Sequence, residues 1–251
     1  MTIVHAHAKL TLSLRITGVR ADGYHLIDAE MVTLDVHDDL EFAPGDGLEI
    51  FGNDHIEVDD NNLVRRALAA VGRTAHVTLT KRIPSGGGLG GGSADAAAVL
   101  RWARCDDQNV AVRLGADVPF CRHQGRARVT GIGEIIEPLP FIARTFTLIT
   151  PPLRVSTPGV YRMWDVLGGP RNQHGVNDLE PAAIAFEPAL ATWRNMILDA
   201  AKLAPTLAGS GATWFVEGDH SSLAQTLIGA TVCVAHTIQA DVETTETQGT
   251  G

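Results

Sequence analysis

The sequence predicts an α+β protein of two domains, and three observations support this fold class. The first sixty residues form short segments in which apolar and polar residues alternate, separated by turn signals, as in an antiparallel sheet. A glycine-rich loop in the middle of the chain runs directly into an alanine-rich helix. After Pro151 and Pro152 a second mixture of helical and extended segments begins, so we place the domain boundary there.

The first domain is expected to cover residues 1–150. Its opening strand is clearest at residues 9–16, where every second residue is leucine or isoleucine. Asp38 and Asp39 are among the turn signals that separate the strands after it. Strands are predicted at residues 31–36, 40–42, 48–51, 56–58, 76–80, 127–130 and 145–150, and one amphipathic helix at 62–71.

The glycine-rich loop is the clearest local signal. Residues 84–92 cannot form regular structure, because six of the seven residues from Gly86 to Gly92 are glycine. Ser93 then provides an N-cap for a predicted helix over residues 94–103, with Asp95 in its first turn. Exposed backbone N–H groups at a helix start form an anion site, for which phosphate is the expected ligand. The loop matches neither a Walker A motif nor a Rossmann fingerprint, and a flexible linker is the alternative.

The second domain is expected to cover residues 151–242. It begins with an extended segment at 153–157, and its order of elements suggests an α+β sandwich. Residues 243–251 carry no apolar side chain and are expected to fray. The predicted elements are helices at 160–166, 188–202 and 222–227, strands at 213–216 and 231–235, and a loop of small residues at 208–212.

Composition excludes several classes of function. The formal charge of −9 argues against nucleic acid as a partner, because binding a phosphate backbone requires a cationic surface. No apolar run is long enough to span a bilayer and the chain does not start like a signal peptide, so we expect a cytoplasmic protein without a membrane partner. The three cysteines lie far apart, and His5 and His7 have no third ligand near them in the sequence, so neither a disulfide framework nor a metal site is predicted. The sequence does not indicate an oligomeric state.

Two polar residues are candidates for catalysis. Lys9 is one of only three lysines and lies in the first alternating strand, whereas Asp117 lies between small residues at a predicted helix start. Phosphoryl transfer needs a carboxylate that takes up the proton of the attacking hydroxyl, and a positive charge beside the phosphoryl oxygens. The alternatives are a lysine on the wet face of an edge strand and an ordinary N-cap aspartate.

Five short motifs follow one another along the chain. They are AKL at residues 8–10, RADGYH at 20–25, IPSGGGLGGGS at 83–93, LGADVPF at 114–120 and GSGAT at 209–213. In this order they resemble the GHMP kinase superfamily, and the second and fourth resemble its branch whose acceptor is a cytidine-diphosphate-linked methylerythritol. The resemblance implies a two-domain GHMP kinase fold, with an N-terminal domain like domain 2 of ribosomal protein S5, a ferredoxin-like C-terminal domain and an active site between them.

The resemblance also implies a reaction, namely phosphorylation of the 2-hydroxyl of 4-diphosphocytidyl-2-C-methyl-D-erythritol in non-mevalonate isoprenoid biosynthesis, with ATP and Mg²⁺ as cofactors. Asp117 then becomes the general base, and Lys9 the cation that stabilises the developing charge. The ATP phosphates would lie against Pro84, Gly86, Gly87, Gly88, Leu89, Gly90, Gly91, Gly92 and Ser93.

The same resemblance implies how the cytidine-diphosphate-linked sugar alcohol is held. Tyr24 would stack on the cytosine ring and His25 would hydrogen-bond its edge. Thr157 matches a family threonine near the reacting hydroxyl, and Tyr161 matches an aromatic residue on the other cytosine face. Thr11 stands where the family usually has an asparagine that helps to hold the substrate hydroxyl.

Two further departures from the family pattern leave alternatives open. Residues 105–114 are shorter than the usual helical insert, and Ala94 stands where a second serine is common. One alternative is a GHMP kinase with a different small-alcohol acceptor, of the mevalonate or homoserine type. The other is a non-catalytic nucleotide-binding relative.

Overall fold

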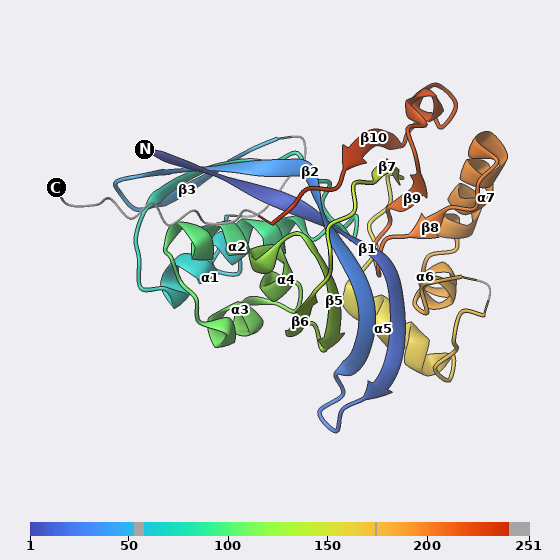
Figure 1. Cartoon of the computed structure of the whole chain (residues 1–251), viewed down its shortest axis with the longest axis horizontal. Helices are drawn as coiled ribbons and strands as arrows, with labels where there is room; N and C mark the ends of the chain where they lie inside the picture. The colour runs from blue at the N-terminus through green and yellow to red at the C-terminus, as the bar shows by residue number, and fades with distance from the viewer. Residues whose placement is uncertain (53–57, 174, 241–251) are drawn as a thin grey trace.

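The computed structural model describes residues 1–52, 58–173 and 175–240, and it contains two β-sheets with helices packed against them (Figure 1). The strands of the first sheet are β1 (Thr2–Val19), β2 (His25–Ala43), β3 (Gly47–Phe51), β4 (His76–Thr80), β5 (Arg126–Gly131) and β6 (Ile135–Pro138). Their order is β3-β4-β2-β5-β6, with β1 paired to β2. The predicted fraying of residues 243–251 lies outside the described residues.

β1 and β2 form one long antiparallel hairpin, drawn as the two blue ribbons in Figure 1. The turn expected at Asp38 and Asp39 is wrong, because β2 continues through both residues. Asp38 is fully buried, and its Oδ1 accepts hydrogen bonds from the backbone N–H groups of Arg82 and Ile83. These hydrogen bonds from residues remote in the sequence compensate the cost of burying the Asp38 carboxylate, although the local sequence around Asp38 resembles a turn.

The antiparallel arrangement expected for the first sixty residues is confirmed for β1 and β2 but not for β3, which pairs with β4 in parallel. β4, β5 and β6, which lie later in the chain, join the sheet in antiparallel pairs with β2 and β5. The connection between β3 and β4 contains the helix α1 (Leu63–Ala70), and a crossover of this kind allows two strands to run in the same direction. Of the strand expected at 56–58, residues 56 and 57 lie outside the described residues, and Val58 belongs to no strand.

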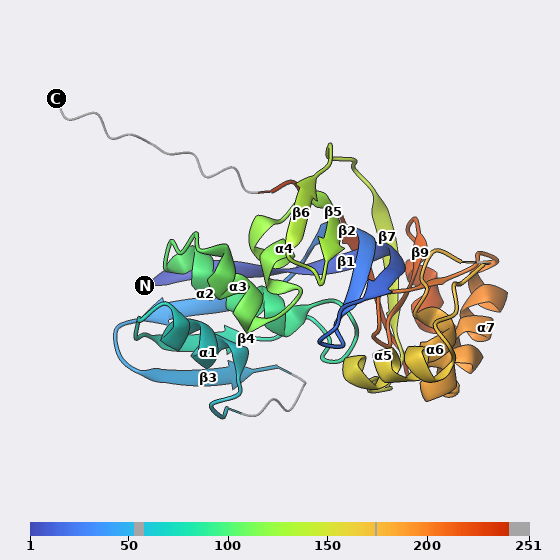
Figure 2. The same cartoon turned by 90° about the horizontal axis from the view of Figure 1, so that it is seen from below.

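Helices cover one face of the first sheet, as Figures 1 and 2 show from two sides. They are α1, α2 (Gly91–Trp102), α3 (Gln108–Leu114) and α4 (Val118–His123). α2 packs its alanine-rich side against β1. The N-cap expected at Ser93 is wrong: the N-cap is Gly90, whose φ of 70° suits glycine, so Ser93 lies in the first turn and Asp95 in the second.

The second sheet has the order and direction of a ferredoxin-like domain. Its strands are β7 (Thr145–Thr150), β8 (Thr206–Leu207), β9 (Trp214–Glu217) and β10 (Thr231–His236). They lie in the order β10-β7-β9-β8, and every pair is antiparallel. The helices α5 (Thr157–Val166), α6 (Glu180–Phe186) and α7 (Ala189–Ala201) separate β7 from β8, and the 3₁₀ turn η1 (Ser221–Gln225) separates β9 from β10, which gives a βαββαβ sequence.

The hydrophobic core does not divide at Pro151. β7, which we expected in the first domain, belongs to the second sheet. One buried cluster of apolar side chains joins α2 and β1 to Phe146 and Phe215 of the second sheet. The other joins Leu14 and Ile16 of β1 to the helices α5, α6 and α7 that follow β7. The position of the boundary between the two domains therefore stays a prediction, although sheet membership changes between β6 and β7. Across the described ranges, none of the helices combines the length and apolar character needed to cross a bilayer.

Candidate active site

A cavity of about 430 Å³ opens between the first strand, the glycine-rich loop, the helix α5 and the loop between β8 and β9. Both expected catalytic residues and three of the expected substrate residues line it. The polar side chains are Lys9, Thr11, Ser93, Asp117, Thr157, Tyr161 and Ser210, and the glycines include Gly86, Gly88, Gly90, Gly91, Gly92 and Gly209. Residues from four of the five sequence motifs thus meet in one place.

Lys9 is a buried cation in this cavity. Only 5% of the residue is exposed, which excludes a lysine on the wet face of an edge strand. Its Nζ donates a hydrogen bond to Thr11 Oγ1 at 3.1 Å and lies 3.4 Å from Asp117 Oδ2. Its backbone N–H donates to the carbonyl of Leu89 at 3.0 Å, so strand and glycine loop are joined directly. A Cβ on Gly90 would lie 2.8 Å from Lys9 Cγ, so only glycine leaves room for the lysine side chain.

A β-bulge accompanies the change from exposed to buried positions along β1. His7 pairs with His37, whereas Lys9 pairs with Thr33, so β2 has two more residues than β1 between these pairs. His5 is exposed and His7 is half-buried, but Lys9 is buried. Bulges re-aim side chains and are common beside active sites, and this one lies where β1 meets the glycine loop.

Asp117 occupies the N-cap position of α4 but does not cap that helix. Its side chain accepts no hydrogen bond from the helix, whereas Asp107, the N-cap of α3, accepts one from the N–H of Asn109 at 2.8 Å. The Asp117 carboxylate is about one-third exposed and faces Lys9 instead. Burial, together with this carboxylate's negative charge, raises the pKa of Tyr161 well above its usual range and that of Cys121 to about 12.

The glycine-rich loop is fixed by the small-residue loop of the second sheet. The N–H groups of Ala212 and Thr213 donate to the carbonyls of Gly86 and Gly87 at 3.3 and 3.0 Å. A Cβ on Gly88 would lie 2.3 Å from the carbonyl oxygen of Ala208, and one on Gly211 would lie 2.1 Å from the nitrogen of Gly88. Backbone packs directly on backbone here, so the alternative of a flexible glycine linker is wrong.

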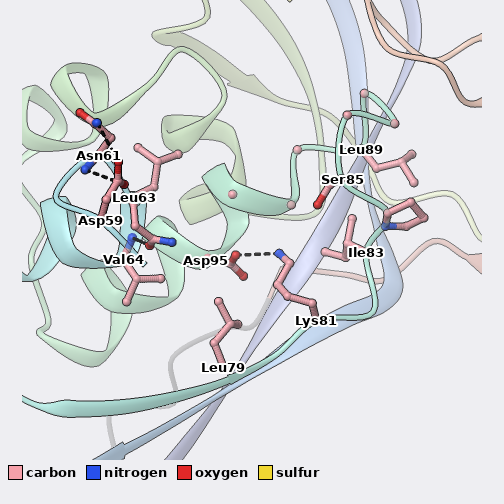
Figure 3. A pocket seen from close by; sticks show the side chains of 18 residues that line it. Asp59, Asn61, Leu63, Val64, Leu79, Lys81, Ile83, Ser85, Leu89 and Asp95 are labelled. Atoms are coloured by element: carbon pink, nitrogen blue, oxygen red, sulfur yellow. Dashed lines mark hydrogen bonds and ion pairs between the residues drawn. The ribbon is translucent and has the colours of Figure 1, made fainter. Parts of the chain in front are cut away.

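A second pocket, of about 480 Å³, lies along the same loop (Figure 3). Asp59, Asn61 and Asn62 line it from the segment before α1, and Leu79 and Lys81 line it from β4 and the residue after that strand. Gly86, Gly88, Gly90, Gly91 and Gly92 line both hollows. The remaining expected loop residues, Pro84, Gly87 and Leu89, line this second pocket. A ligand with a bulky end and a phosphate chain can therefore follow the loop from one hollow to the other.

A buried ionic cluster lies beneath the loop, and the sequence reasoning missed it. Lys81 Nζ donates to Asp38 and, at 2.7 Å, to Asp95, the bond drawn in Figure 3. All three residues are less than 10% exposed. Burial raises the pKa of Asp95 to about 7. The positive charge of Lys81 acts to lower this pKa, but the negative charge of the second carboxylate, Asp38, opposes that effect. The signal available in the sequence was that Lys81 is one of only three lysines and lies three residues before the start of the loop at Pro84.

The structure does not bring every expected cytosine-binding residue to the cavity. Tyr24 lies in the turn between β1 and β2, is 58% exposed, and has the Arg20 guanidinium 5.7 Å from its ring centroid. His25 begins β2, and its ring centroid lies 4.9 Å from that of Tyr161, which does line the cavity. His25 Nε2 lies 2.8 Å from Asp165 Oδ1. The roles of Tyr24 and His25 stay predictions.

Further polar contacts hold the second sheet's loop against β1. Thr157 Oγ1 and Ser210 Oγ share a hydrogen bond of 2.8 Å at the cavity wall. Asn177 Nδ2 donates to the carbonyl of Gly209 at 2.7 Å, and Asp178 Oδ2 accepts from the N–H of Ile16 at 3.0 Å. Sequence reasoning missed Asn177 and Asp178, because nothing in their local sequence indicates partners so far along the chain.

Comparison with known proteins decides the family. A family model described as the GHMP kinases N terminal domain matches residues 62–125. A 4-diphosphocytidyl-2-C-methyl-D-erythritol kinase of Cereibacter sphaeroides (strain ATCC 17025 / ATH 2.4.3) is 38% identical over 246 residues, which covers 86% of this chain and 88% of the relative. The chain belongs to this family of GHMP kinases. It is therefore a small-molecule kinase of the ATP-dependent kind.

Solved structures agree with this assignment. A crystal structure of 4-(cytidine 5'-diphospho)-2C-methyl-D-erythritol kinase matches with a TM-score of 0.75 and 29% identity, over 94% of this chain and 99% of the other. A homoserine kinase from Cytophaga hutchinsonii matches with a TM-score of 0.58 and 17% identity, over 96% of each chain, which shows the shared fold. The α+β GHMP kinase fold expected from the motifs is thus confirmed.

Proposed function

We propose that this chain transfers the γ-phosphate of ATP to the 2-hydroxyl of 4-diphosphocytidyl-2-C-methyl-D-erythritol. The convergence of Lys9 and Asp117 on one cavity beside the glycine loop is the observation that carries the reaction type. The names of the relatives that span most of the chain support the acceptor. The same relatives support a step in isoprenoid precursor synthesis.

Asp117 acts as the general base. Its carboxylate takes the proton of the acceptor hydroxyl while that oxygen attacks the γ-phosphorus, and the bond from phosphorus to the β-phosphate breaks to release ADP. The ammonium of Lys9, 3.4 Å from the carboxylate, offsets the negative charge that develops on the attacking oxygen. Because Lys9 is buried, solvent screens this charge less than it would at the surface.

The glycine loop holds the nucleotide phosphates. Loop glycines 90–92 lead into α2, a helix of twelve residues, so the backbone amides and the helix dipole act on the same anion. The nucleoside lies in the pocket lined by Asn61 and Asn62, and the γ-phosphate reaches across the loop toward Lys9. Pro84, Leu89 and the loop glycines shape this path.

The cavity also fits a magnesium ion bound together with ATP. The hydroxyl of Ser93 lines the hollow beside the loop glycines, and it is a hard oxygen ligand of the kind that Mg²⁺ prefers beside phosphate oxygens. When bound, Mg²⁺ neutralises charge on the β- and γ-phosphates. Ser93 is the residue of this chain that would hold it, and the Asp117 carboxylate beside Lys9 stays available as the base.

The cytosine end of the acceptor lies toward α5. Tyr161 presents its ring to the cavity and contacts His25, so these two residues bind the base, with Tyr24 closing over it from the exposed turn. Thr157 and Thr11 lie on the reacting side, where their hydroxyl groups orient the sugar alcohol. We also propose a cytoplasmic location, and a domain boundary between β6 and β7.

A coupled ADP-release assay tests the proposal. Purified protein with Mg-ATP is expected to release ADP with the cytidyl substrate and not with mevalonate or homoserine. If one of those alcohols were phosphorylated and the cytidyl compound were not, the proposed acceptor would be wrong, although the protein would still be a kinase. Calorimetry that detects ATP binding, in a protein without turnover on any of the three, would indicate a non-catalytic relative.

A further inference from the structure

Three histidine side chains lie close together at the open end of the β1–β2 hairpin, where β1 begins and β2 ends. They do not line the cavity that contains Lys9 and Asp117. In the register of the two strands, His7 lies opposite His37 and His5 lies opposite Asp39. Residues directly opposite one another, and those two positions apart along a strand, share one face of a sheet. The ring centroids of His5 and His37 are 4.5 Å apart, and those of His7 and His37 are 5.1 Å apart. Strand pairing thus supplies the ligands that His5 and His7 lack in the local sequence.

Three of these residues direct possible ligand atoms at one point. His5 Nδ1 lies 2.7 Å from Asp39 Oδ1, and His37 Nε2 lies 3.4 Å from the same oxygen. The three atoms all lie within 4.8 Å of one another. In residues 1–52, 58–173 and 175–240, this is the only group of three or more histidine, cysteine or acidic residues with that property.

Neighbouring groups prepare the ligands for a cation. His37 Nδ1 lies 2.7 Å from the carbonyl oxygen of Asp35, which can only accept a hydrogen bond, so Nδ1 carries the proton and Nε2 presents its lone pair. Asp39 uses Oδ2 to pair with Arg82 at 2.6 Å, which leaves Oδ1 directed at the two imidazoles. Ligating histidines and carboxylates in metal sites are usually oriented by such outer partners.

We propose that His5, His37 and Asp39 bind one Zn²⁺ ion at the surface of the hairpin. Two imidazoles and one carboxylate are a ligand set that Zn²⁺ accepts, with water in the fourth position. Tetrahedral geometry requires ligand atoms about 3.3 Å apart, so His5 Nδ1 and Asp39 Oδ1 move slightly apart on binding. The His5 side chain is 53% exposed and can make this adjustment, and solvent reaches the site directly.

This site is separate from the kinase reaction. Neither the cavity that contains Lys9 and Asp117 nor the pocket along the glycine loop is lined by His5, His37 or Asp39. Mg²⁺ is not expected to compete, because it selects oxygen ligands in octahedral geometry and imidazole does not suit it. The proposed Zn²⁺ site therefore does not depend on which alcohol the kinase phosphorylates.

The test is a Zn²⁺ titration of the full chain without an affinity tag, against a competing chromophoric chelator in the presence of excess Mg²⁺. The wild type is expected to bind one Zn²⁺ per chain, and His5→Ala and His37→Ala are each expected to weaken binding at least about tenfold. A matched control is His76→Ala: His76 is a surface histidine on β4 that lies 3.6 Å from Glu49, without a third ligand. That variant should bind Zn²⁺ like the wild type.

A second measurement separates loss of the site from loss of the fold. Zn²⁺ should raise the midpoint of thermal unfolding of the wild type and of His76→Ala by an amount that grows with the logarithm of its concentration, and the rise should be clearly smaller in His5→Ala at every Zn²⁺ concentration. Turnover with Mg-ATP should be the same in His5→Ala and the wild type. The proposal is overturned by the absence of saturable Zn²⁺ binding, by equal affinity in His5→Ala, or by equal losses in His5→Ala and His76→Ala.

Discussion

Replacing Asp117 by asparagine tests the catalytic arrangement most directly. The substitution keeps the shape of the side chain and removes its charge and its ability to take up a proton. Asparagine and aspartate are equally good N-cap residues, so a capping role would survive the change. In the structure Asp117 makes no cap bond and faces Lys9 at 3.4 Å, so its function should be lost.

The expected size of the effect follows from the role of a general base. Proton transfer by a positioned side chain contributes about 10²–10⁴-fold to a rate, and each decade corresponds to about 1.4 kcal/mol of activation free energy. Asp117→Asn should therefore raise the barrier by about 3–5 kcal/mol. Nucleotide binding should be retained, because the loop amides and not this carboxylate hold the phosphates.

Single-turnover measurement of ADP release gives the chemical step, and calorimetry with ATP gives the affinity. Asp107→Asn is the matched control, because Asp107 is also an N-cap aspartate in the same part of the chain but does bond its helix. Its turnover should stay within about twofold of the wild type, since asparagine caps as well as aspartate. If Asp117→Asn retained wild-type turnover with the cytidyl substrate, the assignment of Asp117 as the base would be refuted.

Three other predictions concern the loop and the buried cluster beneath it. Gly86→Ala should lower the free energy of unfolding in urea by about 1–2 kcal/mol, because φ is +71° there but no atom lies near the added Cβ. Gly88→Ala, at φ +81°, should lower it clearly more, because its Cβ also meets a backbone oxygen. Equal losses in the two variants would contradict the close packing of the loop. Lys81→Met should destabilise the protein by about 3–5 kcal/mol in the same measurement, because two buried carboxylates lose their partner, and a loss below 1 kcal/mol would argue against the buried cluster. Because the pKa of Asp95 is raised to about 7 in the folded protein, the folded state binds more protons than the unfolded state between pH 4 and 7, and stability should fall as pH rises through that window. Asp95→Asn should flatten this part of the stability profile measured by urea unfolding, and an unchanged slope would show that another group titrates.

The sequence predicted the parts of this protein that are encoded locally. The glycine run, the helix after it and the alternation of β1 each depend on neighbouring residues, and the structure has all three. Lys9 and Asp117 were selected by residue type and motif, and the structure brings them into one cavity. The position of the helix start was wrong by three residues, because Gly90 in a left-handed conformation takes the place that Ser93 would normally fill.

What the sequence could not predict depends on pairs of residues that are far apart in the chain. Asp38 looks like a turn residue until Lys81 and the backbone of Arg82 are placed beside it. The parallel pairing of β3 and the membership of β7 in the second sheet likewise depend on which strands meet, and a strand's own pattern does not determine its neighbour. His37 and Asp39 join His5 for the same reason.

The contact of Gly88 with Ala208 and Gly211 ties the glycine loop of the first half of the chain to the small-residue loop of the second sheet, beside the proposed phosphate site. The two loops cannot separate without first breaking this backbone-to-backbone packing, which therefore holds two walls of the cavity together.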